Sequence, residues 1–242
     1  MALSTTITAL ILVLFPVSCL SFSSFSSFEF APNGVCLKPR FFVDDSHTFT
    51  MRNVPGSGDC MFIAVALATA TSMGLGGNDA LLRAISKETR QVVASMLSLP
   101  NGNLFIQKGQ RLVTTRDLLV SSSHKEGMAP DEYLRRLRLE GVEGGLYGGG
   151  PELAVLSNVL RRPISVYELD ATSSLTDDQN QRIRCEGVFG AGVFEDPCAT
   201  SISNSAVLLA QQPGAYSWHL HILVVDVGSE KHACVLLPQE VV

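Results

Sequence analysis

The sequence lacks the features that mark several common classes of protein. None of its six cysteines forms a Cys-x-x-Cys pair, so no structural zinc site is expected. Charged residues make up only 17% of the 242 residues, and the net charge of −5 is spread without long runs, which argues against nucleic-acid binding. There is no internal repeat. With 46% apolar residues, the chain can build a sizeable core as one domain with a tail, or as two small domains.

Long apolar runs are also missing. The run Thr8–Leu20 has thirteen residues and contains Pro16, which makes it too short to cross a bilayer comfortably but suits the core of a signal peptide. It has no basic residue before it, and a Ser- and Phe-rich segment follows. We expect residues 1–33 to be a signal or transit peptide for the secretory pathway or a plastid, with an uncleaved anchor as the alternative. The mature protein is then expected to have no stable membrane span, and a leader without function would leave it cytoplasmic.

The rest of the chain predicts an α+β fold. Residues 34–48 are expected to be a linker with a strand near 40–43, and residues 49–242 to form the main domain, a small central sheet packed between helices. Residues 171–204 are expected to be an irregular insertion, in which Cys185 and Cys198 lie close enough to suggest a local disulfide. Helical spacing and capping residues predict helices over 60–72, 80–97, 133–140 and 151–160, and β-rich runs predict strands over 163–168, 219–227 and 232–237.

Cys60 has the most informative surroundings in the sequence. A turn rich in Gly and Pro, Val54–Asp59, leads into Cys60, which opens an apolar run with helical character. At a helix N-terminus, free N–H groups and the helix dipole favour an anion, and the thiolate is the nucleophilic form of cysteine. The glycines before it let the backbone approach a substrate carbonyl, so N–H groups at Gly58, Asp59 and Cys60 are candidate oxyanion donors. The alternative is a cysteine packed in the core as a small hydrophobe.

A cysteine nucleophile needs a base, and the candidate is His232. It opens the last predicted strand directly after a tight turn, where the sheet holds it and the end of the sheet exposes it. Chance placement is the alternative. His219 and His221 lie on one face of a strand and are read as a solvated or cross-strand pair, because no third metal ligand stands out.

These residues resemble the ovarian tumour (OTU) family of deubiquitinating cysteine proteases. The segment Gly56–Phe62 is similar to the family's cysteine box. Tyr133–Leu137 with Tyr147–Leu153 is similar to its middle block, Asn158–Tyr167 to the helix and strand that follow, and Ile222–Val225 with His232 to its end block. The four blocks occur in the family's order and span residues 50–237.

Departures from the family pattern concern the acid that orients the histidine. Ser57 stands where the family often has Asp before the cysteine, and Cys234 stands where Asp or Asn commonly follows the histidine. The orienting partner is therefore open, with a backbone carbonyl, Ser57 and Asp226 as candidates.

The resemblance implies a deubiquitinase that acts on ubiquitin or polyubiquitin without a cofactor, with Cys60 as nucleophile and His232 as base. Three alternatives stay open. The chain is a non-catalytic or weakly active ubiquitin-binding domain, a cysteine hydrolase of another substrate, or a structural domain with disulfides.

Overall fold

The fold is described from a computed structural model. It covers residues 40–44, 47–56, 58–73, 75, 79–106, 112–170, 181–194, 218–227 and 230–239, which all belong to one compact unit, Leu37–Val242. The predicted targeting segment, residues 1–33, lies outside them, as do Cys19, Cys36, Ser57 and Cys198. In this part of the chain, no helix is both long and apolar enough to cross a membrane.

Helices and strands are mixed along the chain, which confirms the α+β prediction. The larger helices are α2 (Cys60–Ser72), α3 (Asp79–Leu97), α4 (Thr115–Lys125), α5 (Pro130–Arg138) and α6 (Gly150–Leu160), with a short 3-10 turn, η1 (Gly141–Glu143). The strands are β1 (Arg40–Asp44), β2 (His47–Arg52), β3 (Asn103–Leu104), β4 (Val113–Thr114), β5 (Ile164–Leu169), β6 (Gln181–Phe189), β7 (Leu220–Val227) and β8 (Glu230–Pro238).

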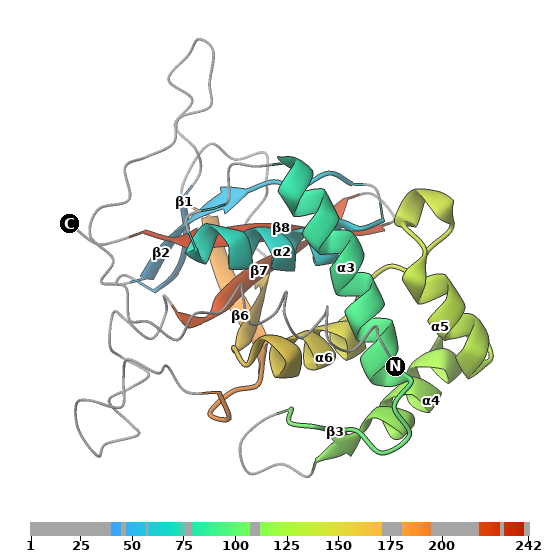
Figure 1. Ribbon diagram of the computed structural model, residues 1–242. Coiled ribbons are helices and arrows are strands. Elements are labelled where there is room, and N and C mark those ends of the chain that lie inside the picture. The colour runs from blue at the N-terminus through green and yellow to red at the C-terminus, as the bar shows by residue number, and fades with distance from the viewer. Residues whose placement is uncertain are drawn as a thin grey trace. The chain divides into compact units, whose positions relative to one another are not determined.

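Six of the strands form a sheet that closes on itself in the order β1-β2-β8-β7-β5-β6 (Figure 1). The pairs β1–β6 and β5–β7 are parallel and the others are antiparallel, including the predicted hairpin of β7 and β8. Each strand contributes to a core inside the closed sheet, which contains Phe41, Phe49, Tyr167, Ile183, Leu223, Val225, Cys234 and Leu236. Because the sheet is closed, side chains from its own strands pack against one another and bury its inner face.

The other face of the sheet packs against helices. Because side chains alternate along a strand, Ile222, Ala233 and Val235 face outward into a second core that α2 dominates. All residues from Cys60 to Ala70 are buried, as expected for a helix that is apolar all round. Helix α2 lies between the sheet and α3 (Figure 1). The N-terminus of α2 is therefore held in the interior rather than on a mobile surface.

Strand β6 corrects the expectation of an irregular insertion over residues 171–204, which is wrong for residues 181–189. In β6 the side chains of Gln181 and Ile183 are buried, whereas those of Arg182 and Arg184 are exposed. This alternation is that of a half-buried strand, but the polar residues hide it in the sequence. Pairing with β5 on one side and β1 on the other supplies the backbone hydrogen bonds.

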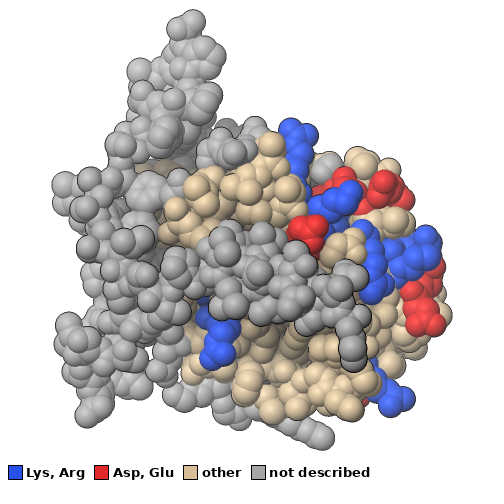
Figure 2. All heavy atoms as spheres, in the orientation of Figure 1, with Lys and Arg blue, Asp and Glu red and all other residues tan. Residues whose placement is uncertain are grey.

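The face shown in Figure 2 carries charges of both signs. Lys, Arg, Asp and Glu side chains mingle over the side where Figure 1 places α3 and α5. Lys87 of α3 pairs with Glu140 at 2.9 Å, and Arg135 pairs with Glu132 within α5 at 2.7 Å. Such exposed pairs contribute little to stability because solvent screens them. This surface is a mixed one rather than a patch of a single sign.

Candidate active site

Cys60 is the first residue of α2, as the sequence predicted. Its side chain is buried, with 5% of the residue exposed. Asp59 occupies the N-cap position, and its carbonyl oxygen accepts the hydrogen bond from the N–H of Ile63. The side chain of Asp59 makes no cap hydrogen bond, so the first N–H groups of α2 are not capped by it. The thiol thus lies where backbone N–H groups and the helix dipole favour negative charge.

His232 is half-buried near the start of β8, and its imidazole has a side-chain partner. Its Nε2 lies 3.0 Å from Oδ1 of Asn53, the residue that follows the end of β2. The same oxygen accepts hydrogen bonds from the N–H of Val54 at 3.0 Å and from the thiol of Cys234 at 3.4 Å. A backbone N–H can only donate, which identifies this atom of Asn53 as the amide oxygen rather than the nitrogen. Nε2 therefore carries a proton in this contact.

The tautomer leaves Nδ1 of a neutral His232 with a free electron pair. A Cβ atom placed on Gly56 would lie 3.8 Å from both Nδ1 and Cε1 of this ring. The loop that leads into Cys60 therefore passes the Nδ1 edge of the imidazole, while Asn53 holds the opposite edge. This is the arrangement that a histidine base needs, with one nitrogen anchored and the other directed toward the loop of the nucleophile.

Cys234 belongs to the same group of side chains as His232 and Asn53. Burial, first, and the neighbouring charge of Cys60, second, raise the pKa of the Cys234 thiol to about 11. Cys234 and His232 lie on the same side of β8 because they are two residues apart, and both contact Asn53. The structure therefore gathers Cys234, His232 and Asn53 at the junction of β2 and β8, and the loop before Cys60 passes the imidazole at Gly56.

Asp226, one of the orienting candidates from the sequence, has a different placement. Asp226 is exposed and pairs with Lys231 across the hairpin, whereas His232 pairs with Val225. Successive residues of a strand point to opposite faces, so Asp226 faces away from the side that His232 occupies. Ser57 lies outside the described residues. Asn53, which sequence reasoning missed, is the described side chain that contacts the imidazole.

A glycine is required at position 58 for two reasons. Its φ angle is +80°, a left-handed conformation that side chains other than glycine rarely adopt. A Cβ atom there would also lie 2.9 Å from the Cα atom of Gly141, in the turn that follows α5. The backbone of the proposed oxyanion segment thus lies directly against the start of η1.

The side chain of Asp59 binds groups on two other elements. Its carboxylate accepts hydrogen bonds from Nε of Arg90 at 2.6 Å and from the N–H of Gly141, which is 3.1 Å from each oxygen. Arg90 lies in α3, is fully buried, and is a second residue that sequence reasoning missed. An apolar helix face with an arginine in it gives no clear signal, because arginines of helices usually face solvent.

The predicted middle block assembles beside α2. Tyr133 donates a hydrogen bond of 2.5 Å to the buried carboxylate of Glu152, which also accepts one of 2.8 Å from the N–H of Gly149. Burial, first, and Glu152, second, raise the pKa of Tyr133. Gly148 lies so close to α2 that a Cβ atom would be 1.9 Å from Cε of Met61. The glycine-rich loop is thereby seated on the first turn of α2, with Tyr147 exposed.

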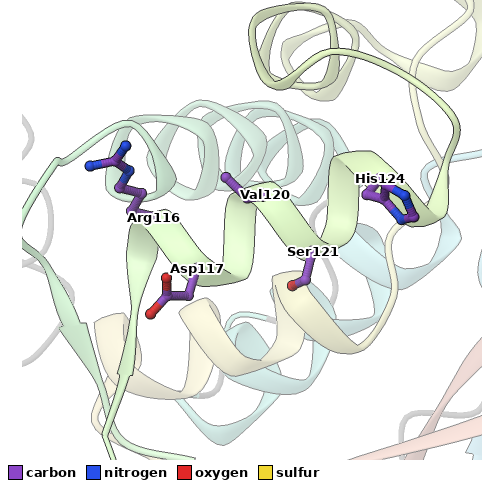
Figure 3. A pocket seen from close by; sticks show the side chains of 5 residues that line it. All are labelled: Arg116, Asp117, Val120, Ser121 and His124. Atoms are coloured by element: carbon purple, nitrogen blue, oxygen red, sulfur yellow. The ribbon is translucent and has the colours of Figure 1, made fainter.

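Three other features of the described residues were candidates for a functional site: a surface hollow, a metal site and a disulfide. A surface hollow of about 680 Å³ runs along α4 and is lined by Arg116, Asp117, Val120, Ser121 and His124. Figure 3 shows these five side chains along the same helix, and none of them belongs to the group around His232. In the described part of the chain, no three His, Cys, Asp or Glu side chains are placed to hold a metal ion. Cys185 is a free, exposed thiol, and Cys198 lies outside the described residues.

Comparison with solved structures gives several similar OTU domains. One is the Hazara virus OTU bound to ubiquitin, with 15% identity, a TM-score of 0.41, and coverage of 84% of this chain and 96% of that chain. A second is the viral OTU domain protease from Dera Ghazi Khan virus, with 16% identity, a TM-score of 0.45, and coverage of 84% and 88%. A third is an OTU domain in complex with ubiquitin, with 13% identity, a TM-score of 0.40, and coverage of 81% and 73%.

Comparison with curated protein sequences gives no significant match. A family model described as OTU-like cysteine protease, in contrast, matches residues 55–197, which is more than half of the chain. The matched segment contains Cys60 and the middle block, and His232 follows it in the sequence. The chain therefore belongs to the OTU-like cysteine protease family.

Proposed function

We propose that the protein is a thiol-dependent deubiquitinase that hydrolyses the isopeptide bond between the C-terminal glycine of ubiquitin and a lysine. Family membership supports the cysteine protease chemistry. Ubiquitin is the substrate that the resemblance to deubiquitinating proteases implies, and two of the similar OTU structures are complexes with it. The observation that carries the proposal is the contact of His232 Nε2 with Asn53, which leaves Nδ1 on the side of the Cys60 loop.

The proposed reaction uses these groups in order. Nδ1 of His232 takes the proton of the Cys60 thiol, and the thiolate attacks the glycyl carbonyl carbon. The N–H groups of Gly58, Asp59 and Cys60 hold the oxyanion that forms. The imidazolium then protonates the lysine amine as the C–N bond breaks, leaving ubiquitin bound to Cys60 as a thioester. Water, deprotonated by His232, attacks the thioester, which releases ubiquitin with a free C-terminal carboxylate.

Asn53 is proposed to orient the base. Its amide oxygen fixes the tautomer in which Nδ1 is free, and it can hold the imidazolium through the Nε2 proton during the reaction. A neutral amide stabilises the imidazolium less than a carboxylate does. We therefore expect a functional but slower enzyme than one with an aspartate at this point.

A ubiquitin probe with an electrophilic C-terminus tests the proposal. Under reducing conditions the wild-type chain should form a covalent adduct, and Cys60→Ala and His232→Ala should form none. Cys185→Ser is the matched control, because Cys185 is an exposed free thiol outside the site and its loss should leave labelling unchanged. A wild-type chain that binds ubiquitin without forming an adduct would reject the enzyme. Alkylation of Cys60 by iodoacetamide without probe labelling would reject ubiquitin as substrate and point to another cysteine hydrolase.

A further inference from the structure

Arg90 is an unusual residue for the interior of this protein. It has no solvent exposure, and its guanidinium spans four acceptors on three separate segments. It binds the carboxylate of Asp59, the carbonyl of Gly58 at 3.1 Å, and the carbonyls of Leu137 at 3.2 Å and Leu146 at 3.0 Å. The ring of Phe62 lies 4.2 Å below it. Each of the three guanidinium nitrogens, Nε, Nη1 and Nη2, thus donates a hydrogen bond.

Stability alone does not explain this arrangement. A buried ion pair loses its hydration, and replacement by apolar side chains of similar volume is often neutral or stabilising. A buried arginine that holds backbone carbonyls fixes directions instead, because its planar fork binds only in a defined geometry.

The direction that Arg90 fixes is that of the peptide between Gly58 and Asp59. In a trans peptide the C=O and N–H groups point in opposite directions. Since the carbonyl of Gly58 points to Nη2 of Arg90, the N–H of Asp59 points away from the guanidinium. This N–H is one of the groups proposed to hold the oxyanion. Gly58 has a left-handed backbone, and a glycine peptide without a partner can rotate easily, so the contact prevents a rotation that would turn the N–H away.

The same guanidinium also fixes the segment between α5 and α6. It binds the carbonyl of Leu137 at the end of α5 and that of Leu146 in the glycine-rich loop. Asp59 completes the connection by accepting from the N–H of Gly141. The loop before Cys60 and the segment 139–149 are therefore held by one buried group. Val142 and Tyr147, on that segment, are exposed.

We propose that Arg90 is a positioning residue, which locks the Gly58–Asp59 peptide so that the N–H of Asp59 faces the oxyanion of the acyl-transfer reaction. The inference rests on the proposed function, because it concerns the tetrahedral intermediate of that reaction. It predicts a specific separation of effects. Loss of Arg90 should impair attack on a carbonyl, which needs the oxyanion donors, but not alkylation of Cys60 by iodoacetamide, which forms no oxyanion.

Arg90→Lys is the informative variant, because it keeps a positive charge beside Asp59 but cannot reach all four acceptors. Turnover of ubiquitin with a fluorogenic C-terminal amide should fall on the order of 10²-fold in kcat, the loss typical of one oxyanion donor. KM should be unchanged, since the interaction is made only in the transition state. The alkylation rate of Cys60 should stay close to that of the wild type. Gln91→Ala is the matched control: Gln91 ties α3 to the carbonyl of Arg138 at 3.0 Å but does not contact Gly58.

Each outcome decides the proposal. A folded Arg90→Lys variant with wild-type kcat overturns it, and so does an equal fall of kcat and alkylation, which would indicate that Arg90 merely supports the fold. If Arg90→Lys does not fold, Asp59→Asn is measured in the same way, because it loosens the guanidinium while keeping the side-chain volume. Wild-type kcat there overturns the proposal, and a selective loss of kcat supports it. Failure of the proposed function is recognised separately, by a wild-type chain that does not turn over the substrate.

Discussion

The amide oxygen of Asn53 lies 3.0 Å from Nε2 of His232, across 179 positions of sequence. The contact arises from the sheet, because β2 pairs with β8 so that Arg52 is opposite Val235. One residue beyond the end of β2, Asn53 lies beside Cys234 and contacts both Cys234 and His232. A neutral amide thus contacts the imidazole, whereas the sequence offered a backbone carbonyl, Ser57 and Asp226 as its orienting partner. The relationship leads to a direct test by substitution.

Removal of the Asn53 amide should slow the proposed reaction without unfolding the protein. In Asn53→Ala the imidazole loses the acceptor that fixes its tautomer. We expect kcat/KM to fall on the order of 10²-fold, the lower end of the rate enhancement that a general base contributes. Asn53→Asp keeps an acceptor in the same position and adds a charge that stabilises the imidazolium, so its kcat/KM should be at least that of the wild type. The pH profile of kcat/KM with the fluorogenic ubiquitin amide is the measurement, because a purely structural role would not shift it.

The control for Asn53→Ala is Asn158→Ala. Asn158 also uses its side-chain amide to bind backbone groups, those of Phe105, but it does not belong to the group around His232. Its loss should leave the pH profile unchanged. Equal effects of the two substitutions, or a wild-type profile in Asn53→Ala, would contradict the orienting role.

Cys234 should remain a thiol over the pH range in which the enzyme is assayed. Its pKa of about 11 results mainly from burial, with a smaller contribution from Cys60. Since only the thiolate is alkylated, modification of Cys234 by iodoacetamide should rise about tenfold per pH unit below that pKa. In Cys60→Ser the neighbouring charge is gone, so the pKa of Cys234 should fall below about 11 but stay above the ordinary 9.0. Mass spectrometry of the alkylated peptides measures both, and an unchanged profile in Cys60→Ser would contradict the coupling.

Local patterns in the sequence were sufficient to place Cys60. A glycine-rich turn followed by an apolar run predicts a helix with the thiol at its start, and both features are short-range. The hairpin of β7 and β8 is likewise a local feature, so the position of His232 followed from it. The site residues that were missed depend on contacts between distant segments. Asn53 acquires its partner from the register of β2 on β8, and Arg90 from the packing of α3 on α2.

Strand β6 shows a different limit. Its outward side chains include Arg182, Arg184 and Glu186, so the segment is as polar as an ordinary surface loop. Only its partners on both sides make it a strand, because β1 and β5 leave a row of backbone groups to be paired. Closure of the sheet is a property of the whole fold, and a window of sequence around β6 contains no information about it.

Gly58→Ala should damage both stability and the proposed reaction. The variant forces a side chain into a left-handed conformation at a cost of roughly 1–2 kcal/mol, and its Cβ must also push Gly141 away. Gly127→Ala is the matched control, because Gly127 has a φ angle of +66° but open space around its Cβ position. Urea unfolding should show the larger loss for Gly58→Ala, and only this variant should lose kcat. Equal losses of stability would show that the close approach to Gly141 carries no cost.

His219 should make the protein less stable in mild acid. Burial, first, and Arg162, second, lower its pKa from 6.5 to about 4. Above pH 6.5 the imidazole is neutral in both the folded and the unfolded chain and has no effect. As the pH falls from 6.5 to 4, the unfolded chain binds a proton that the folded chain excludes, so the free energy of unfolding decreases, by about 2 kcal/mol at about pH 5. Below pH 4 both states are protonated and no further loss comes from this residue.

The test compares urea unfolding near neutral pH and at about pH 5 in the wild type, His219→Gln and His124→Gln. A glutamine at position 219 can still bind Ser165, which contacts His219 at 2.9 Å, but it does not titrate. The decrease in stability between the two pH values should therefore be smaller in His219→Gln by the amount that this histidine contributes. His124→Gln, which removes an exposed imidazole on α4, is the control for the loss of a histidine elsewhere in the chain. Carboxylates that titrate in the same range affect all three proteins equally. If the free energy of unfolding decreases by the same amount in all three, His219 accepts its proton in the folded state as readily as in the unfolded one, and the prediction is wrong.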